Sequence, residues 1–323
     1  MPPGCPAAGE DDQPHDEAIV TGPIKAAWRL TRLPEYVSFV VITTVLGAAA
    51  GGGSLGWALL VVLIANWLAV GFGFMINDVE DAPDDALTPA KAQRNPISSG
   101  ELSPRFARLL SFSVAILAAV LYASLGLGPF LSGLLCLALG YLYSTRPFRL
   151  KARPVADLLS HALGLAGLQF VAAYLTFEGG APLKWASALG FLLAISLYGQ
   201  LFNQLRDFDG DRTAGVNHTA SHLGRRTSNF LMLILLSIGI ATAAFSILFA
   251  HLFPLWVLLV TLLLAVLLSL PRLPGVLKAQ SSIEAQRPLQ KPVEIAAAIA
   301  LLLWFAGPRT IALISGILGD PHP

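Results

Sequence analysis

Long apolar runs recur along the whole chain and restrict what it can fold into. A helix that crosses a bilayer needs about 20 predominantly apolar residues. Nine runs fit that length, at about residues 35–51, 56–76, 106–126, 129–145, 155–177, 183–204, 229–250, 254–270 and 292–318. Charged residues make up 13% of the chain, against about 25% in soluble domains. The sequence therefore predicts an all-α, polytopic membrane protein of about nine transmembrane helices.

The two ends of the sequence differ in character. Residues 1–21 are rich in Pro, Gly and acidic side chains, and we expect them to form a disordered polar tail. Residues 22–320 read as a single membrane-embedded domain. The two cysteines, Cys5 and Cys136, give no basis for a disulfide framework. We expect no nucleic-acid partner and no obligate protein partner.

Two acidic segments of the same pattern follow the second and the sixth apolar runs. Both read Asn-x-x-x-Asp-x-x-x-Asp, at an offset of 126 residues from Asn77 to Asn203. Residues four apart lie on one face of a helix, where like charges repel unless a cation binds. Oxygen ligands of this kind suit a hard ion such as Mg²⁺. The predicted metal ligands are Asn77, Asp81, Asp85, Asn203, Asp207 and Asp211.

The same offset suggests an internal duplication, with spans one to four repeated as spans five to eight. Motifs four spans apart must open on the same side of the membrane. All Lys and Arg residues except Lys184 and Arg309 fall on that side. Since positive loops are cytoplasmic, we expect the N-terminus and both acidic motifs to face the cytoplasm.

Cations bridged by two acidic clusters would make a strong anion site. The natural ligand is a diphosphate, and basic residues are available on the same side to share its charge. A diphosphate at the mouth and an apolar bundle below it predict a substrate with a charged head and a long hydrocarbon tail. The basic candidates are Lys91, Arg94, Arg146, Lys151, Arg206 and Arg212.

Three motifs together resemble the UbiA superfamily of intramembrane prenyltransferases. They are N-D-x-x-D-x-x-x-D after the second span, Y-S-x-R-P-x-R-L-K after the fourth and D-x-D-G-D after the sixth. The resemblance covers roughly residues 25–318. It implies a helical bundle around a central cavity, Mg²⁺ dependence, and transfer of a prenyl group from a prenyl diphosphate to a lipophilic acceptor.

The resemblance also implies roles for individual residues. The catalytic set it implies is Asp78, Asp81, Asp207 and Asp211. The substrate-binding set is Asn77, Lys91, Arg94, Tyr143, Arg146, Lys151, Asn203 and Arg206. Where the family often reads Asn-Arg-Pro, this chain reads Arg94-Asn95-Pro96.

Several alternatives stay open at this point. The acceptor could be a quinone-precursor ring or another lipid. A terpene cyclase acting on a prenyl diphosphate, or phosphoribosyl transfer to a polyprenyl phosphate, would use the same acids. A transporter would bury charge near the bilayer midplane, whereas these acids lie at helix ends. Asp157 and His161 could be a helix N-terminal acid and an interior histidine, or could handle a proton; His218 could be an acid–base residue.

Overall fold

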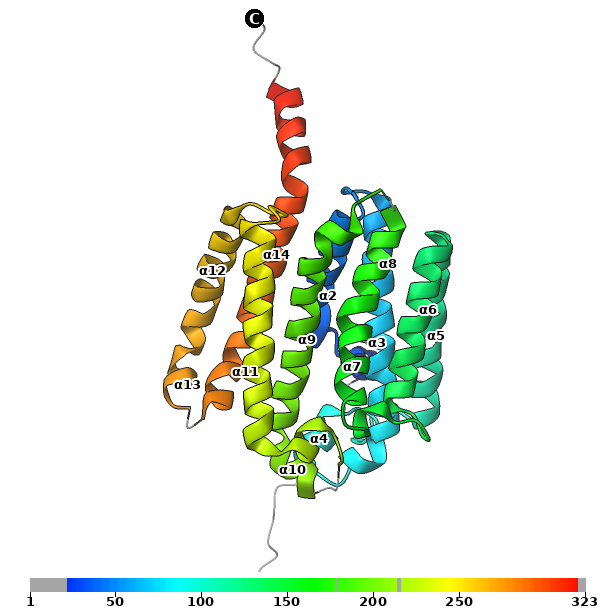
Figure 1. Cartoon of the computed structure of the whole chain (residues 1–323). Helices are drawn as coiled ribbons and strands as arrows, with labels where there is room; N and C mark the ends of the chain where they lie inside the picture. The colour runs from blue at the N-terminus through cyan, green and yellow to red at the C-terminus, as the bar shows by residue number, and fades with distance from the viewer. Residues whose placement is uncertain (1–21, 178, 214–215, 280, 319–323) are drawn as a thin grey trace, which may run out of the picture.

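The computed structural model describes residues 22–177, 179–213, 216–279 and 281–318, and within these ranges it is helical and contains no strand (Figure 1). Nine helices of the described chain are long and apolar enough to cross a membrane. The all-α, nine-span prediction is confirmed, and the chain is an integral membrane protein. The polar tail predicted for residues 1–21 lies outside the described residues.

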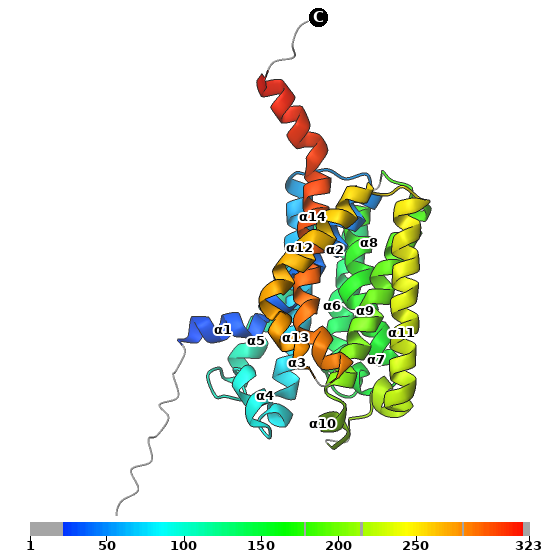
Figure 2. The same cartoon turned by 90° about the vertical axis from the view of Figure 1, so that its left-hand side faces the viewer.

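The first half of the chain supplies six helices. They are α1 (Pro23–Thr31), α2 (Leu33–Ala50), α3 (Trp57–Asp85), α4 (Pro89–Arg94), α5 (Pro104–Ser124) and α6 (Leu127–Ser144). Figure 2 shows α1 lying across the long axis of the bundle. It buries Ala26 and Leu30 and exposes Ile24 and Trp28, which is the pattern of a helix in the membrane interface.

The second half continues with shorter pieces between its long helices. The elements are η1 (Leu150–Ala152), α7 (Ala156–Ala162), the π-helical η2 (Leu163–Gly167), α8 (Leu168–Phe177), η3 (Pro182–Trp185), α9 (Ala186–Arg206), α10 (Phe208–Thr213), α11 (Thr219–Leu248), α12 (Leu255–Ser269), η4 (Leu270–Arg272), α13 (Leu273–Leu277) and α14 (Ser282–Leu318). The segments α7, η2 and α8 together make one span.

Close packing at the centre of the bundle depends on small residues. A Cβ added to Gly47 on α2 would lie 2.3 Å from the carbonyl oxygen of Phe170 and 2.9 Å from the Cβ of Ala173 on α8. Small residues let membrane helices approach closely, because packing and hydrogen bonds drive their association in lipid. The α2–α8 contact therefore requires glycine at position 47.

Helix boundaries in the two halves follow the offset of the acidic motifs. When 126 is added to the residue numbers of the first-half helices, α2 overlaps α7–α8, α3 overlaps α9, α5 overlaps α11 and α6 overlaps α12. Thr43 on α2 donates a hydrogen bond of 3.2 Å to the side-chain oxygen of Gln169 on α8, a residue 126 positions later. This common spacing favours the predicted duplication, and the central α2–α8 contact is where its two halves meet.

Two helices extend beyond their predicted limits. The apolar run of the second span was expected to end near residue 76; α3 runs on to Asp85, which confirms that the first acidic motif is helical, as its four-residue spacing predicted. The seventh span was expected to begin near residue 229, but α11 begins at Thr219 and changes direction at Gly224, whose φ is 78°. Both extensions are rich in polar residues, so hydropathy alone does not reveal them.

Candidate active site

The two acidic motifs lie at the same end of the bundle. Figures 1 and 2 show α4, which follows the first motif, and α10 of the second motif at the same, lower end of the bundle. Lys91 on α4 places its Nζ 4.0 Å from Oδ1 of Asp211 on α10. This ion pair joins the two halves of the chain.

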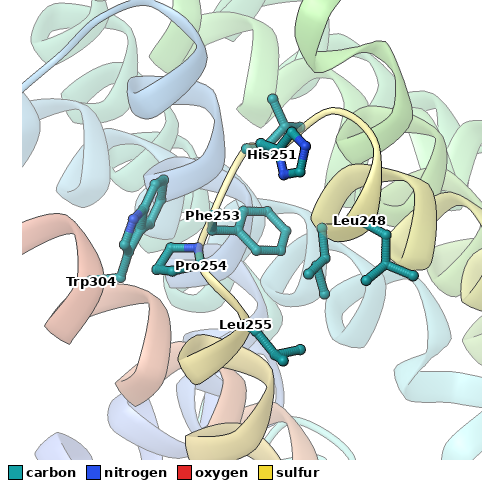
Figure 3. A pocket seen from close by; sticks show the side chains of 8 residues that line it. Leu248, His251, Phe253, Pro254, Leu255 and Trp304 are labelled. Carbon is teal, nitrogen blue, oxygen red and sulfur yellow. The ribbon is translucent and has the colours of Figure 1, made fainter.

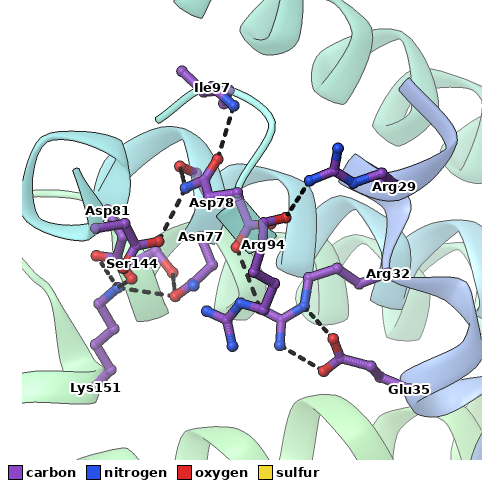
Figure 4. A network of polar contacts seen from close by, with 12 residues as sticks. Arg29, Arg32, Glu35, Asn77, Asp78, Asp81, Arg94, Ile97, Ser144 and Lys151 are labelled. Atoms are coloured by element: carbon purple, nitrogen blue, oxygen red, sulfur yellow. Dashed lines mark hydrogen bonds and ion pairs between the residues drawn. The ribbon is translucent and has the colours of Figure 1, made fainter. Parts of the chain in front are cut away.

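Asn77 and Asp81 of α3 share one lysine (Figure 4). The Nζ of Lys151 donates to both carboxylate oxygens of Asp81, each at 2.5 Å, and to Oδ1 of Asn77 at 2.9 Å. Ser144, at the end of α6, also donates to Asn77, at 3.0 Å. The loop after α6 therefore brings its predicted basic residue onto the first motif.

Lys151 and its neighbour Arg149 set the charge around Asp81. Arg149 lies 3.4 Å from Asp81 and 2.9 Å from Asp84. Burial lowers the pKa of Lys151 below its usual value, and the negative charge of Asp81 opposes that shift. The amine is thus a desolvated donor aimed at the acidic motif.

Asp78 has a different set of neighbours from Asn77 and Asp81. Arg32, at the junction of α1 and α2, donates to Oδ1 of Asp78 at 3.2 Å and also pairs with Glu35. Oδ2 of Asp78 is buried and has no hydrogen-bond partner. The side chain of Arg94 extends toward Arg32 in Figure 4, so two guanidinium groups lie close to this acid.

Asp85, the last acid of the first motif, is held by the loop behind it. The amide nitrogen of Asn95 donates to Asp85 at 3.0 Å and to the backbone carbonyl of Asp78 at 2.8 Å. Asp85 and Asn95 are both buried. The segment from Leu87 to Asn95, which includes α4, is therefore held against the end of α3 by the hydrogen bonds of Asn95.

The second motif does not form one continuous helical face, and that prediction is wrong. Asn203 lies on α9, Asp207 is the residue after the last turn of α9, and Asp211 lies on the separate helix α10. Aspartate and glycine favour helix ends and turns, and the segment after Arg206 reads Asp-Phe-Asp-Gly-Asp. Phe208 is buried in the break, with Arg225 stacked 4.7 Å from its ring.

Arg206 and His218 contact the side chains of the second motif. Arg206 pairs with Asp207 at 2.8 Å and donates to Asn203 at 3.2 Å. The Nε2 of His218 lies 3.1 Å from Asp211. Each acid of this motif therefore has a cationic or polar partner, as Asp81 does in the first.

The other predicted substrate-binding residues are less closely placed. The hydroxyl of Tyr143 accepts a hydrogen bond of 2.8 Å from Gln200, and its ring lies 6.4 Å from that of His161. Arg146 is exposed, and the described residues offer it no contact with either motif.

No three His, Cys, Asp or Glu side chains of the described chain lie close enough together to hold a metal ion.

The pocket in Figure 3 lies between the α11–α12 loop and α14, at the end of the bundle that is opposite α4 and α10 in Figure 1. Its volume is about 590 Å³ and its lining is mostly apolar, with His251 and Trp304 as polar-edged members. None of the acids of the two motifs borders it. The charged cluster at the α4 and α10 end is therefore the candidate active site.

Sequence reasoning missed three residues of this site. Arg32 was not among the predicted site residues, whereas its side chain reaches Asp78. Asn95 and Gln204 carry no charge and follow no spacing rule, although each is buried in contact with the site. The available signals were adjacency to predicted site residues, of Gln204 to Asn203 and of Asn95 to Arg94.

Sequence comparison shows that this chain is similar to known prenyltransferases and related enzymes. A 2-acylphloroglucinol 4-prenyltransferase of Humulus lupulus is 32% identical over 163 residues, covering 48% of this chain and 39% of that protein. A lycopene elongase/hydratase of Haloarcula japonica is 31% identical over 198 residues, covering 60% of this chain and 65% of that protein. The matches thus span less than two thirds of either relative.

Solved structures show the same fold. A UbiA homologue of Archaeoglobus fulgidus bound to GPP and Mg²⁺ superposes with a TM-score of 0.67 at 22% identity, covering 87% of this chain and 98% of that one. The sequence profile described as the UbiA prenyltransferase family matches residues 39–281. With three quarters of the sequence inside that profile, this chain belongs to the UbiA prenyltransferase family.

Proposed function

We propose that this protein transfers a prenyl group from a prenyl diphosphate to a lipophilic acceptor in a Mg²⁺-dependent reaction. The observation that carries the proposal is the Lys91–Asp211 contact of 4.0 Å, because it brings the segment behind the first acidic motif to the last acid of the second motif. Family membership supports the reaction class. The Archaeoglobus homologue, described as bound to GPP and Mg²⁺, supports the substrate class.

The donor chemistry of the two motifs fits Mg²⁺. Asn77, Asp81 and Asp85 offer amide and carboxylate oxygens, as do Asn203, Asp207 and Asp211, and hard divalent cations prefer such oxygens. Asp78 adds a buried carboxylate oxygen without a partner. When bound, Mg²⁺ would neutralise charge that develops on the leaving diphosphate.

Basic side chains around the motifs would bind the diphosphate oxygens. Lys151 is the least exposed of them and lies against Asn77 and Asp81. Lys91, Arg94 and Arg206 surround the same mouth. Preorganised donors of this kind stabilise a leaving anion without reorganising during the reaction. Tyr143 and Arg146 remain proposed contacts of the substrate, and Asp78, Asp81, Asp207 and Asp211 the proposed catalytic acids.

The apolar helices below the mouth would hold the prenyl chain and exclude water. Loss of diphosphate from an allylic carbon leaves a cation that water would otherwise capture. A nucleophilic carbon or oxygen of the acceptor takes the prenyl group instead. The acceptor is lipophilic, in keeping with a relative named for the hydrocarbon lycopene. The mouth faces the cytoplasm, as the distribution of Lys and Arg indicates.

The test is a lipid analysis of a host that expresses the protein. Wild-type protein should yield a prenylated lipid that is missing from hosts carrying Asp81→Asn or Asp207→Asn at equal abundance in the membrane. The same product formed by both variants would refute the proposal. Incubation of purified protein with labelled prenyl diphosphate alone separates the alternative, since a cyclic hydrocarbon or alcohol would identify a cyclase.

A further inference from the structure

Asp157 is a buried acid that the proposed reaction does not use. It lies in the first turn of α7 and is fully inaccessible to solvent. Its Oδ1 accepts hydrogen bonds from the backbone of Leu158, at 2.7 Å, and from the hydroxyl of Thr219. Its Oδ2 accepts from Nε2 of Gln204, at 2.6 Å, and from the backbone of Thr219, at 2.7 Å. Every contact is a donor, so the site is built for a carboxylate.

These contacts tie the start of α7 to two elements of the second motif. Gln204 belongs to the last turn of α9, and its Oε1 accepts from the backbone of Ala220 at 2.9 Å. Thr219 is the first residue of α11. Its hydroxyl also accepts from the backbone of Val155, at 2.8 Å. Asp157 and Gln204 thus form one closed network between three helices.

Through Gln204 the network fixes the rotation of α9 about its axis. Consecutive helical residues differ by about 100° around that axis. With Gln204 held toward Asp157, the neighbouring Asn203 must point to another side of the helix. That side is where Arg206 donates to Asn203. A change in the Gln204 contact would therefore rotate Asn203 away from its place in the motif.

Through Thr219 the network fixes His218. His218 caps α11: its Nδ1 accepts from the backbone of Ser221 at 3.1 Å, which leaves Nε2 facing Asp211 at 3.1 Å. The backbone of the next residue, Thr219, is bound to Asp157. Both arms of the network thus end on predicted metal ligands.

The first motif has a set of contacts equivalent to the Asp157–Gln204 network, with the charges arranged differently. We call each of these two sets of contacts a clamp. Asp78 lies one residue after Asn77, as Gln204 lies one residue after Asn203. Arg32, at the start of the first span, holds the side chain of Asp78, as Asp157, at the start of the fifth span, holds Gln204. The loops behind each motif complete the clamps, through Asn95 and through the backbone of Ala220.

We propose that Asp157 is a positioning residue for the second acidic motif, acting on Asn203 through Gln204 and on Asp211 through Thr219 and His218. The inference rests on the proposed function of that motif as a cation–diphosphate site. Residues that orient ligands from behind typically change metal affinity by about 10- to 100-fold when they are replaced. Asp157 touches neither of the ligands it orients.

Asp157→Asn tests the role, because an amide must turn its own NH₂ group toward donors. The Mg²⁺ concentration for half-maximal binding of a non-reactive prenyl thiolodiphosphate should rise about 10- to 100-fold. Without any ligand, deuterium exchange should increase in the peptide covering residues 203–213. Tyr122→Phe is the matched control: it removes a buried hydrogen bond of 2.6 Å to Asn66, far from the motifs. It should lower thermal stability and leave both readouts unchanged.

Two further variants keep the inference open to refutation. Gln204→Met removes the link to α9 and leaves Asp157 its other donors, so it should weaken binding even if Asp157→Asn does not fold. The double variant Asp157→Asn/Gln204→Glu returns an acceptor to the network and should recover part of the lost affinity. Wild-type binding and exchange in Gln204→Met would overturn the proposal. If the wild-type protein turns over no prenyl diphosphate, the proposed function fails, while the exchange result still decides the positioning role.

Discussion

Lys91 and Asp211 form an ion pair of 4.0 Å between the two halves of the chain, and both side chains remain partly exposed, by 48% and 18%. Exposed pairs of this kind contribute less than about 1 kcal/mol to stability. The contact therefore places a partly exposed cation at the mouth of the site and adds little to the fold.

Replacing Lys91 by Ala should accordingly impair substrate binding without loss of stability. We expect the KM for prenyl diphosphate to rise about tenfold, because a charge-assisted contact to an anion is worth about 1.5 kcal/mol or more. Steady-state kinetics and a thermal unfolding assay measure the two effects. Arg108→Ala is the matched control, since Arg108 pairs with Glu80 at 3.3 Å on the exposed side of α3. An unchanged KM in Lys91→Ala would contradict the assignment of Lys91 to the diphosphate.

Lys151 should have two opposite effects on the site. Its amine lies 2.5 Å from both oxygens of Asp81 and so competes with a metal ion for that acid. Lys151→Met should lower the Mg²⁺ concentration needed for half-maximal binding, and it should also reduce kcat about 10²-fold, as loss of a preorganised anion donor does. Metal titration and single-turnover kinetics separate the two effects. Arg149→Met, which removes a weaker contact to Asp81 at 3.4 Å, should shift both quantities less.

Most of the fold could be predicted from the sequence, because a lipid bilayer restricts which structures can span it. Hydropathy located nine spans, since a bilayer demands long apolar helices. It could not locate the polar ends of α3 and α11, where residues such as Asp81 and Thr219 continue a helix outside the apolar stretch. Local propensity also favours the break at Asp207, which the strict four-residue spacing of the acids concealed.

The sequence predicted only those site residues that belong to a repeated or clustered pattern of charged side chains. The Asn-x-x-x-Asp-x-x-x-Asp pattern identified the acids, and the basic loop identified Lys151. The clamps made by Arg32, Asn95 and Gln204 depend on which residues meet in three dimensions, and one sequence does not contain that information. Asp157 was visible as an acid at a helix start, but its four donors come from residues up to 62 positions away.

Gly47 should be intolerant of any side chain. A Cβ there would lie 2.3 Å from the backbone oxygen of Phe170, and a backbone atom cannot move aside as a flexible side chain can. Gly47→Ala should cost about 1–3 kcal/mol, in the range of overpacked cores, and should lower the temperature at which the detergent-solubilised protein loses its monodisperse peak. Gly199→Ala is the control, because no atom lies within 4 Å of a Cβ at that position. Equal stability of the two variants would contradict the close α2–α8 contact.

Leu87 and Leu183 offer a matched test of orientation. Leu87 follows the first acidic motif and is 84% exposed, whereas Leu183 lies in η3 at the other end of the bundle and is 87% exposed. In a Cys5→Ser background, Leu183→Cys should react with a membrane-impermeant maleimide in intact cells. Leu87→Cys should react only after the membrane is opened, because its loop lies on the Lys- and Arg-rich side. Cys136 is buried and should stay unlabelled in both cases. The reverse labelling would put the mouth of the site outside the cytoplasm and its diphosphate substrate on the wrong side of the membrane.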